Sequence, residues 1–231
     1  MASTASGQLH LKTAGRTAGA LMLAQGIGGY LTNFGLLGPA TAPPGFLVSA
    51  STHPLHIGAA ALVGIVAGAL STAIAITVLP VFRRHSETMA LWLLALAIAA
   101  LSLAAVENGR VMSMLSLSQA YAASGATDPA AFEGLRGVVA ASRNWAHFTH
   151  LVVGGSTYFV FYAITFRFAL IPRALAGFGM AAVALQLTTV SLPFLGGHVI
   201  FPMLAPAGIA LLAMALWLIV KGFADKTAAP M

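Results

Sequence analysis

Cysteine is absent from this 231-residue chain, and charged side chains are scarce. The absence of cysteine excludes disulfides, zinc–thiolate sites, iron–sulfur clusters and cysteine nucleophiles, so any chemistry must use histidine, methionine, carboxylates or hydroxyls. Charged residues make up 7% of the sequence, whereas soluble domains carry about 25%. Because so few charges cannot cover a surface that faces water, the composition indicates a protein whose main solvent is lipid.

Acidic residues are fewer than basic ones, with 5 Asp and Glu against 11 Lys and Arg and a net charge of +6. A basic excess can indicate binding to nucleic acid. The longest basic run, however, is Arg83-Arg84, and unequal loop charges in a membrane protein explain the excess more simply. We therefore expect no nucleic-acid partner.

Long uncharged runs dominate the sequence. A helix needs about 20 mostly apolar residues to cross the hydrocarbon core, and helices are the reasonable structure for runs of this length in lipid. Six candidate spans, uncharged except for Glu107 and Arg110 at the end of the third, cover about residues 17–38, 56–82, 88–110, 144–166, 174–195 and 199–220. The sequence therefore predicts an all-α, polytopic integral membrane protein, a six-helix transmembrane bundle that forms one domain over residues 1–231.

The longest segment between two predicted spans covers about residues 111–143. Thr127-Asp128-Pro129 has the pattern of a helix N-cap followed by proline in the first turn. We therefore expect an outer loop over 111–143 that contains a short helix near 129–141, although the third helix could also continue toward Tyr121.

Basic residues are divided unequally between the two sides that six spans would define. One set of helix ends carries Lys12, Arg16, Arg83, Arg84, Arg167, Arg173, Lys221 and Lys226. The opposite set carries Arg110, Arg136 and Arg143. Because the cytoplasmic side of a membrane protein has the excess of Lys and Arg, both chain ends are predicted to be cytoplasmic.

Residues 17–38 could instead form a signal peptide, since Pro39-Ala40-Thr41-Ala42 resembles a small-residue cleavage site. The apolar segment of a signal peptide usually has about 7–15 residues. The run in this chain is longer, and the run that follows it is also uncharged. A retained transmembrane helix is therefore the favoured interpretation.

Three stretches of the sequence resemble one family of bacterial membrane proteins. They are residues 11–19 (LKTAGRTAG), 170–177 (LIPRALAG) and 215–223 (ALWLIVKGF). Together they are similar to domain-of-unknown-function family 4386, and the resemblance extends over nearly the whole chain. It implies a six-helix protein of the bacterial inner (plasma) membrane, and it assigns no activity and no functional residue.

Five of the seven histidines fall at the predicted outer ends of helices. They are His53, His56, His147, His150 and His198. Two pairs have the spacing His-x-x-His, which puts both imidazoles on one face of a helix. Glu107 lies at the same predicted depth, and a carboxylate near the hydrocarbon region is costly enough to indicate a functional role.

These residues suggest a metal or haem site at the outer face. Imidazole is the commonest metal ligand, and helical bundles build metal sites from side chains on several helices. Histidines with a carboxylate suit Zn, Fe or Cu, and two opposed histidines could hold a haem. His56 and His150 are the strongest candidates, because each lies inside its helix. The further candidates are His53, His147, His198 and Glu107.

The same residues also have simpler interpretations. Histidine is common at helix ends near lipid head groups, where an amphipathic ring suits the interface. Glu107 could reach water, or it could pair with Arg110, which lies three residues further along the same helix. Either arrangement would leave these side chains with a purely structural role.

Two other classes of function stay open. The bundle interior could bind a small apolar molecule, as in a carrier or receptor, with Glu107 and Arg110 at the polar end of the pocket. The chain could also be an accessory membrane subunit that acts through protein contacts. The sequence does not decide whether the protein is an enzyme or what its oligomeric state is. The lipid bilayer is the one partner that all these hypotheses share.

The predicted orientation can be tested with single cysteines, because the chain contains none. In intact cells a Ser124→Cys variant should react with an impermeant thiol reagent, since the segment around Asp128 is predicted to face outward. A Ser86→Cys variant should react only after the membrane is permeabilised. Labelling at position 86 but not at position 124 would reverse the orientation.

Overall fold

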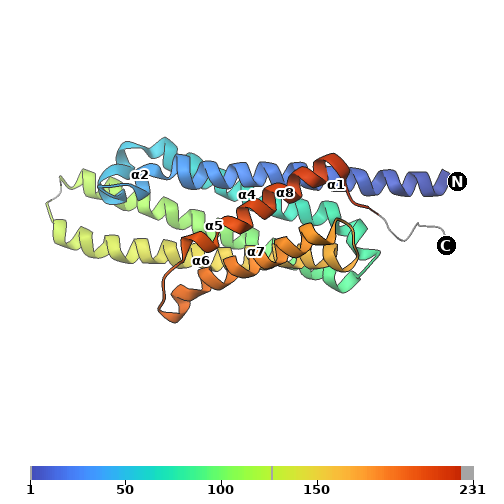
Figure 1. Ribbon diagram of the computed structural model, residues 1–231. Helices are drawn as coiled ribbons and strands as arrows, with labels where there is room; N and C mark the ends of the chain where they lie inside the picture. The colour runs from blue at the N-terminus through green and yellow to red at the C-terminus, as the bar shows by residue number, and fades with distance from the viewer. Residues whose placement is uncertain (1, 126, 225–231) are drawn as a thin grey trace. The chain divides into compact units, whose positions relative to one another are not determined.

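A computed structural model describes residues 2–125 and 127–224, so Lys226 lies outside the described residues. Within these two ranges every regular element is a helix. The six long helices are α1 (Ala2–Tyr30), α4 (Pro54–Arg83), α5 (Glu87–Ala123), α6 (Pro129–Arg167), α7 (Arg173–Ser191) and α8 (Ala205–Lys221) (Figure 1). The short elements are η1 (Leu31–Leu36), α2 (Gly38–Thr41), α3 (Phe46–Ser49), η2 (Ala50–Thr52), η3 (Leu192–Leu195) and η4 (Phe201–Met203).

Five helical segments are long and apolar enough to cross a membrane. They are Pro54–Arg83, Glu87–Ala123, Pro129–Arg167, Arg173–Leu195 and Phe201–Lys221. This number of apolar helices confirms the prediction of an all-α, multi-pass membrane protein. The predicted span at 17–38 is helical through η1, but it is not among these five segments, and its place in the membrane stays a prediction.

The segment 111–143 differs from the predicted outer loop with a short helix. Helix α5 continues without a break to Ala123, and α6 begins at Pro129 and runs to Arg167. The predicted helix start is correct, since Asp128 Oδ1 accepts a hydrogen bond from the Ala131 backbone N–H at 3.2 Å. The helix does not stop near residue 141, and the next proline after Pro129 is Pro172, beyond the end of α6.

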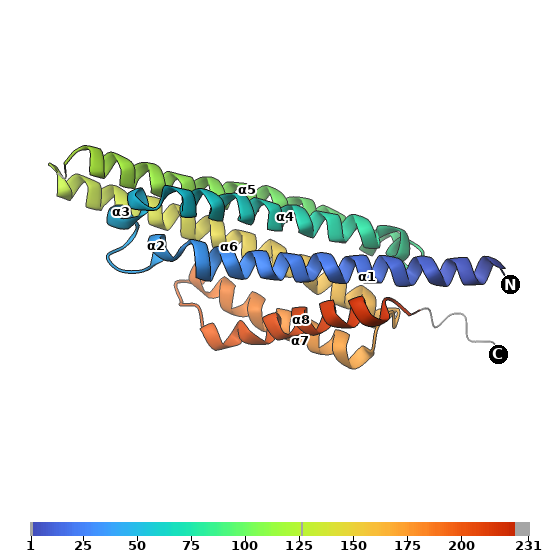
Figure 2. The same ribbon diagram turned by 90° about the horizontal axis from the view of Figure 1, so that it is seen from above.

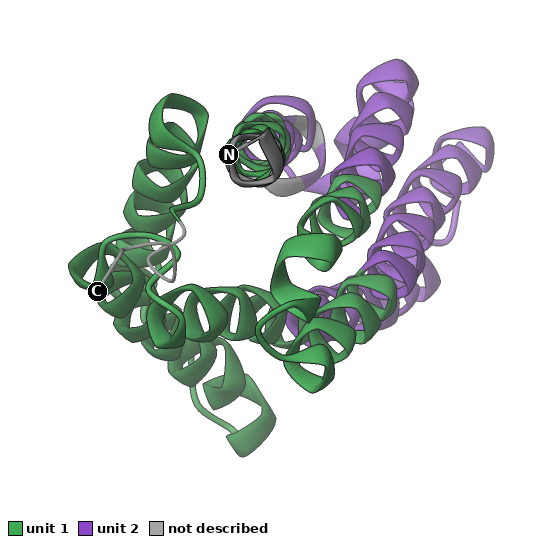
Figure 3. Ribbon diagram, turned by 90° about the vertical axis from the view of Figure 1, so that its right-hand side faces the viewer, with its two compact units in different colours: residues 1–26, 69–100, 151–231 green, residues 27–68, 101–150 purple. Residues whose placement is uncertain are grey.

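The chain folds into two compact units, which Figure 3 distinguishes by colour. Unit 1 consists of residues 1–26, 69–100 and 151–231, and unit 2 of residues 27–68 and 101–150. Helices α1, α4, α5 and α6 contribute residues to both units, whereas α7 and α8 belong wholly to unit 1. The candidate site described below lies entirely within unit 2.

Unit 1 contains the hairpin of α7 and α8, which lie side by side in Figures 1 and 2. Three aromatic rings at one end of its core come from α4, from α6 and from Phe223, two residues after the end of α8. The ring centroid of Phe82 lies 5.4 Å from that of Phe161 and 5.7 Å from that of Phe223. All three side chains are buried, so this end of unit 1 is closed by aromatic packing.

Helices α1 and α8 approach so closely in unit 1 that glycine is required between them. A Cβ atom on Gly19 would lie 2.7 Å from the Ala215 carbonyl oxygen and 2.9 Å from the Ile219 nitrogen. One turn earlier, a Cβ atom on Gly15 would lie 2.5 Å from the Phe223 nitrogen. These neighbours are backbone atoms that cannot rotate away, so the glycines permit the short helix separation typical of membrane bundles.

Unit 2 is held together by apolar packing and by one buried hydroxyl. The Ser118 hydroxyl of α5 donates to the Leu47 carbonyl at 2.9 Å and accepts from the Ser51 backbone N–H at 2.8 Å. It thereby fixes the irregular segment α3–η2 on α5. The apolar residues of this core are Leu37, Ala40, Phe46, Ala50, Ile57, Ala60, Val111, Met114 and Leu115.

The α1–α8 contact predicts a different effect for two glycine substitutions. Gly19→Ala should lower the free energy of unfolding by about 1–3 kcal/mol, the usual cost of overpacking. Gly208→Ala on α8 is the matched control, because no atom lies within 4 Å of its added Cβ, and alanine favours the helix by about 0.5–1 kcal/mol. Reversible unfolding in mixed micelles, followed by circular dichroism, measures both. Equal stability of the two variants would contradict the close approach.

Candidate functional site: a carboxylate held by arginine and two histidines

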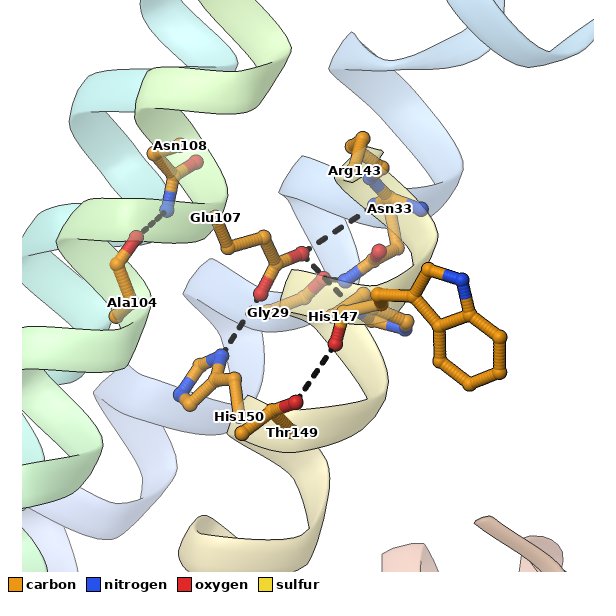
Figure 4. A network of polar contacts seen from close by, with 10 residues as sticks. Gly29, Asn33, Ala104, Glu107, Asn108, Arg143, His147, Thr149 and His150 are labelled. Carbon is orange, nitrogen blue, oxygen red and sulfur yellow. Dashed lines mark hydrogen bonds and ion pairs between the residues drawn. The ribbon is translucent and has the colours of Figure 1, made fainter. Parts of the chain in front are cut away.

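Glu107 of α5 is the centre of a polar network in unit 2 (Figure 4). Its side chain is 11% exposed, and all three of its partners come from α6. Oε1 accepts hydrogen bonds from Arg143 Nη2 at 3.3 Å and from His147 Nδ1 at 2.7 Å, and Oε2 accepts one from His150 Nδ1 at 2.8 Å. Both carboxylate oxygens are therefore occupied.

The sequence of α6 explains why three donors meet one carboxylate. Arg143, His147 and His150 are separated by four and three residues, which puts them on one face of an α-helix over two turns. The two histidines are close enough to donate hydrogen bonds to the two carboxylate oxygens of Glu107 from the same side. Arginine has a longer side chain and reaches the same carboxylate from the next turn.

Asn108, the residue after Glu107, is also buried and serves the packing of helices. Its amide donates to the Ala104 carbonyl at 2.7 Å. A Cβ atom on Gly64 of α4 would lie 2.5 Å from Asn108 Oδ1. Glycine at position 64 therefore lets α4 pack directly against the Asn108 amide. Helix α5 thus contacts α4 through Asn108 and the donors of α6 through Glu107.

The hydrogen bonds define the form of the imidazoles that suits this site. An ionised carboxylate has only acceptor atoms, so each histidine donates its Nδ1–H to Glu107. In a neutral imidazole this leaves Nε2 as an acceptor with a free lone pair. Two Nε2 atoms are thus available for a proton, a ligand or a metal, whereas the Glu107 oxygens are already engaged.

The first His-x-x-His pair is not part of this network. His53 and His56 are exposed, and their ring centroids lie 5.7 Å apart. His53 Nδ1 lies 2.9 Å from Thr52 Oγ1 and 3.1 Å from the Ser49 carbonyl oxygen. Within residues 2–125 and 127–224, no hydrogen bond, ion pair or ring contact joins this pair to the second pair of histidines.

His198, the fifth predicted ligand, is exposed and belongs to unit 1. Across the described part of the chain, no group of three or more His, Asp or Glu side chains has an arrangement that could hold a metal ion. The structure therefore brings together Glu107, His147 and His150 from the predicted set, and it does so through hydrogen bonds between them.

Arg143 is the residue of the network that the sequence interpretation missed. One alternative paired Glu107 with Arg110, but that side chain is exposed and, among the described residues, has no ion-pair partner. Arg143 takes its place, with its side chain only 14% exposed. The missed signal is the spacing of Arg143 from the two histidines, which puts all three donors on one helix face.

A cavity of about 280 Å³ lies in unit 2 beside the network. Helix α6 supplies Arg136, Ala140, Arg143 and Asn144 to its wall. The other walls are formed by Leu37, Ala40, Gly45, Phe46, Val111 and Met114. Arg143 therefore lines the cavity and also donates a hydrogen bond to the buried carboxylate of Glu107.

The family model described as Domain of unknown function (DUF4386) matches residues 17–222. The chain belongs to this family. No match was found among curated proteins or among solved structures. The match covers all four residues of the network, and it confirms the family resemblance of the sequence.

The network predicts that Glu107 matters more for stability than an exposed carboxylate. Glu107→Gln should lower the free energy of unfolding by about 2–3 kcal/mol, the scale of hydrogen bonds to a charged group. Glu87→Gln is the matched control, since Glu87 is exposed on the same helix and pairs with Arg83; it should change the free energy by no more than about 0.5 kcal/mol. Equal effects in detergent unfolding would contradict a stabilising role of the Glu107 network.

Proposed function

We propose that the protein is a membrane carrier or receptor for a small amphipathic acid, which binds in the unit 2 cavity with its acidic group at Arg143. The single observation that carries the proposal is the double role of Arg143, which lines the cavity and bonds the buried carboxylate of Glu107. In this form of the carrier or receptor hypothesis, Arg143 forms the polar end of the pocket in place of the Glu107–Arg110 pair.

The composition of the cavity supports an amphipathic ligand. Its charged and amide groups, Arg136, Arg143 and Asn144, all come from α6, whereas α5 and the segment 37–46 present apolar side chains or glycine. Its volume of about 280 Å³ is near the lower end of the roughly 300–1,000 Å³ found for ligand pockets. A molecule with a short hydrocarbon chain and one polar group matches these walls.

The charges favour an acidic group over a basic one. Arg136 already pairs with Glu133 of its own helix, and no Asp or Glu is among the described residues that line the cavity. A guanidinium has five N–H donors, and within the described residues Arg143 uses one hydrogen bond for Glu107. The remaining donors match a carboxylate, which arginine binds in a bidentate manner.

Glu107, His147 and His150 would support this role by holding Arg143 in place. A buried guanidinium without a counter-ion would be costly, and Glu107 provides one. The histidines complete the hydrogen bonding of Glu107, so the carboxylate does not need all of the donors of Arg143. The ligand can therefore share the guanidinium with Glu107 instead of displacing it.

The proposal includes the topology expected from the sequence. We place six spans in the bacterial inner membrane, with α1 and η1 as the sixth beside the five candidate spans, and with both chain ends in the cytoplasm. The positions of Lys and Arg support this orientation. The cavity residues of α5 and α6 then lie toward the outer side.

Binding of decanoate to protein in lipid nanodiscs tests the proposed function. Wild-type protein should bind decanoate saturably and bind decanol, which lacks the charge, more weakly. Arg143→Gln should weaken decanoate binding by about tenfold or more, because hydrogen bonds to charged groups contribute about 1.5–3 kcal/mol. Calorimetric titration measures this, with empty nanodiscs as the reference for partition into lipid.

Two further variants make the test specific. Arg110→Gln removes an exposed arginine of α5 that does not line the cavity, and it should leave decanoate affinity unchanged. Ala140→Phe fills the cavity from α6 without removing a charge, and it should abolish saturable binding. Equal binding of decanoate and decanol, or equal loss with Arg110→Gln, would contradict the proposal.

The metal or haem hypothesis has one observation in its favour. Glu107 fixes both imidazoles through Nδ1, and carboxylates commonly orient metal-binding histidines in this way. His147 and His150 would be the ligands, with Glu107 behind them, and exogenous groups would complete the coordination. A stoichiometric transition metal, or a haem band in the visible spectrum of purified protein, would support this second candidate over the first.

A further inference from the structure

Unit 1 contains a second cavity, a groove that shares no lining residue with the proposed acid site. It has a volume of about 510 Å³ and lies between α1 and α4. Helix α1 contributes His10, Thr13 and Thr17, and α4 with the residue after it contributes Thr77 and Arg84. We propose that this groove binds the phosphate group of an anionic phospholipid of the surrounding membrane.

The two adjacent arginines at the end of α4 have different environments. Arg83 forms an ion pair with Glu87, four residues later. Arg84 lines the groove, and among the described residues no carboxylate pairs with it. No Asp or Glu of the described chain contributes to the groove wall. The positive charge of Arg84 is therefore available to an anion, whereas that of Arg83 is already compensated.

The other polar groups fit the several oxygen atoms of a phosphate. Thr13 and Thr17 are four residues apart, so their hydroxyls lie on one face of α1, and within the described residues neither has a hydrogen-bond partner. The Thr77 hydroxyl donates to the Ala73 carbonyl at 2.7 Å, so it is not a free donor. Arg84, the two α1 hydroxyls and the His10 imidazole supply the donors that a phosphate diester needs.

The position of the groove favours a lipid as the source of this phosphate. Helix α4 is one of the apolar spans, and it ends at Arg83. Lipid head groups lie at the end of a spanning helix, and basic pockets between transmembrane helices bind them. Ile76 is 56% exposed and lies one turn before Pro80 of the groove, on the same face of α4. An acyl chain attached to a phosphate at Arg84 would meet this apolar surface.

Native mass spectrometry of protein released from mixed nanodiscs of phosphatidylglycerol and phosphatidylcholine tests the site. Wild-type protein should retain phosphatidylglycerol in preference to phosphatidylcholine. Arg84→Gln should reduce that preference by about fivefold, the effect of one basic residue near an anionic surface. Arg83→Gln is the matched control, and it should reduce the preference by much less, because Arg83 is paired with Glu87.

Two further measurements distinguish a specific lipid site from general electrostatic attraction and from a site for soluble phosphate. Ala14→Phe fills the groove from α1 and keeps every charge, so it should lower phosphatidylglycerol retention as Arg84→Gln does. Excess inorganic phosphate should not displace the lipid, since it has no acyl chain. Equal loss in the Arg83 and Arg84 variants, or displacement by inorganic phosphate, would overturn the proposal.

Discussion

A carboxylate buried inside a chain whose main solvent is lipid must obtain its hydrogen-bond donors from the protein itself. Glu107 meets this requirement with three side chains of one neighbouring helix, and the arrangement fixes both the distance and the rotation of α6 relative to α5 within unit 2. A charge left without these donors would be costly in this environment. The cavity and the orientation of Arg143 both depend on that constraint.

Glycine has the complementary role in the rest of the structure. Apolar side chains gain little from leaving lipid, so membrane helices associate through close packing and hydrogen bonds. The absence of a side chain at Gly64 of α4 leaves room for the Asn108 amide, and its absence at Gly19 of α1 leaves room for the backbone of α8. Polar and glycine positions therefore work together: glycine brings the helices close, and the buried polar groups select one rotation among the possible contacts.

The sequence predicted those features that depend on local chemistry. The long apolar runs predicted helices, Asp128-Pro129 marked a helix start, and Glu107 stood out because a carboxylate is costly near lipid. It did not predict which basic residue pairs with Glu107, because a neighbour in the same helix competes with one brought in by tertiary packing. Both His-x-x-His pairs have the same spacing, but spacing does not say which face of a helix points inward.

Past the polar network, α5 continues to Ala123, and α6 begins at Pro129. Close to these two helix ends the rings of Tyr121 and Phe132 are in contact, with centroids 5.2 Å apart. A protein of 23.6 kDa that is mostly within a micelle gives electron microscopy few features for particle alignment. A rigid domain inserted between these two helix ends would be connected through two paired helices, and it would provide a fiducial whose orientation follows that of the site.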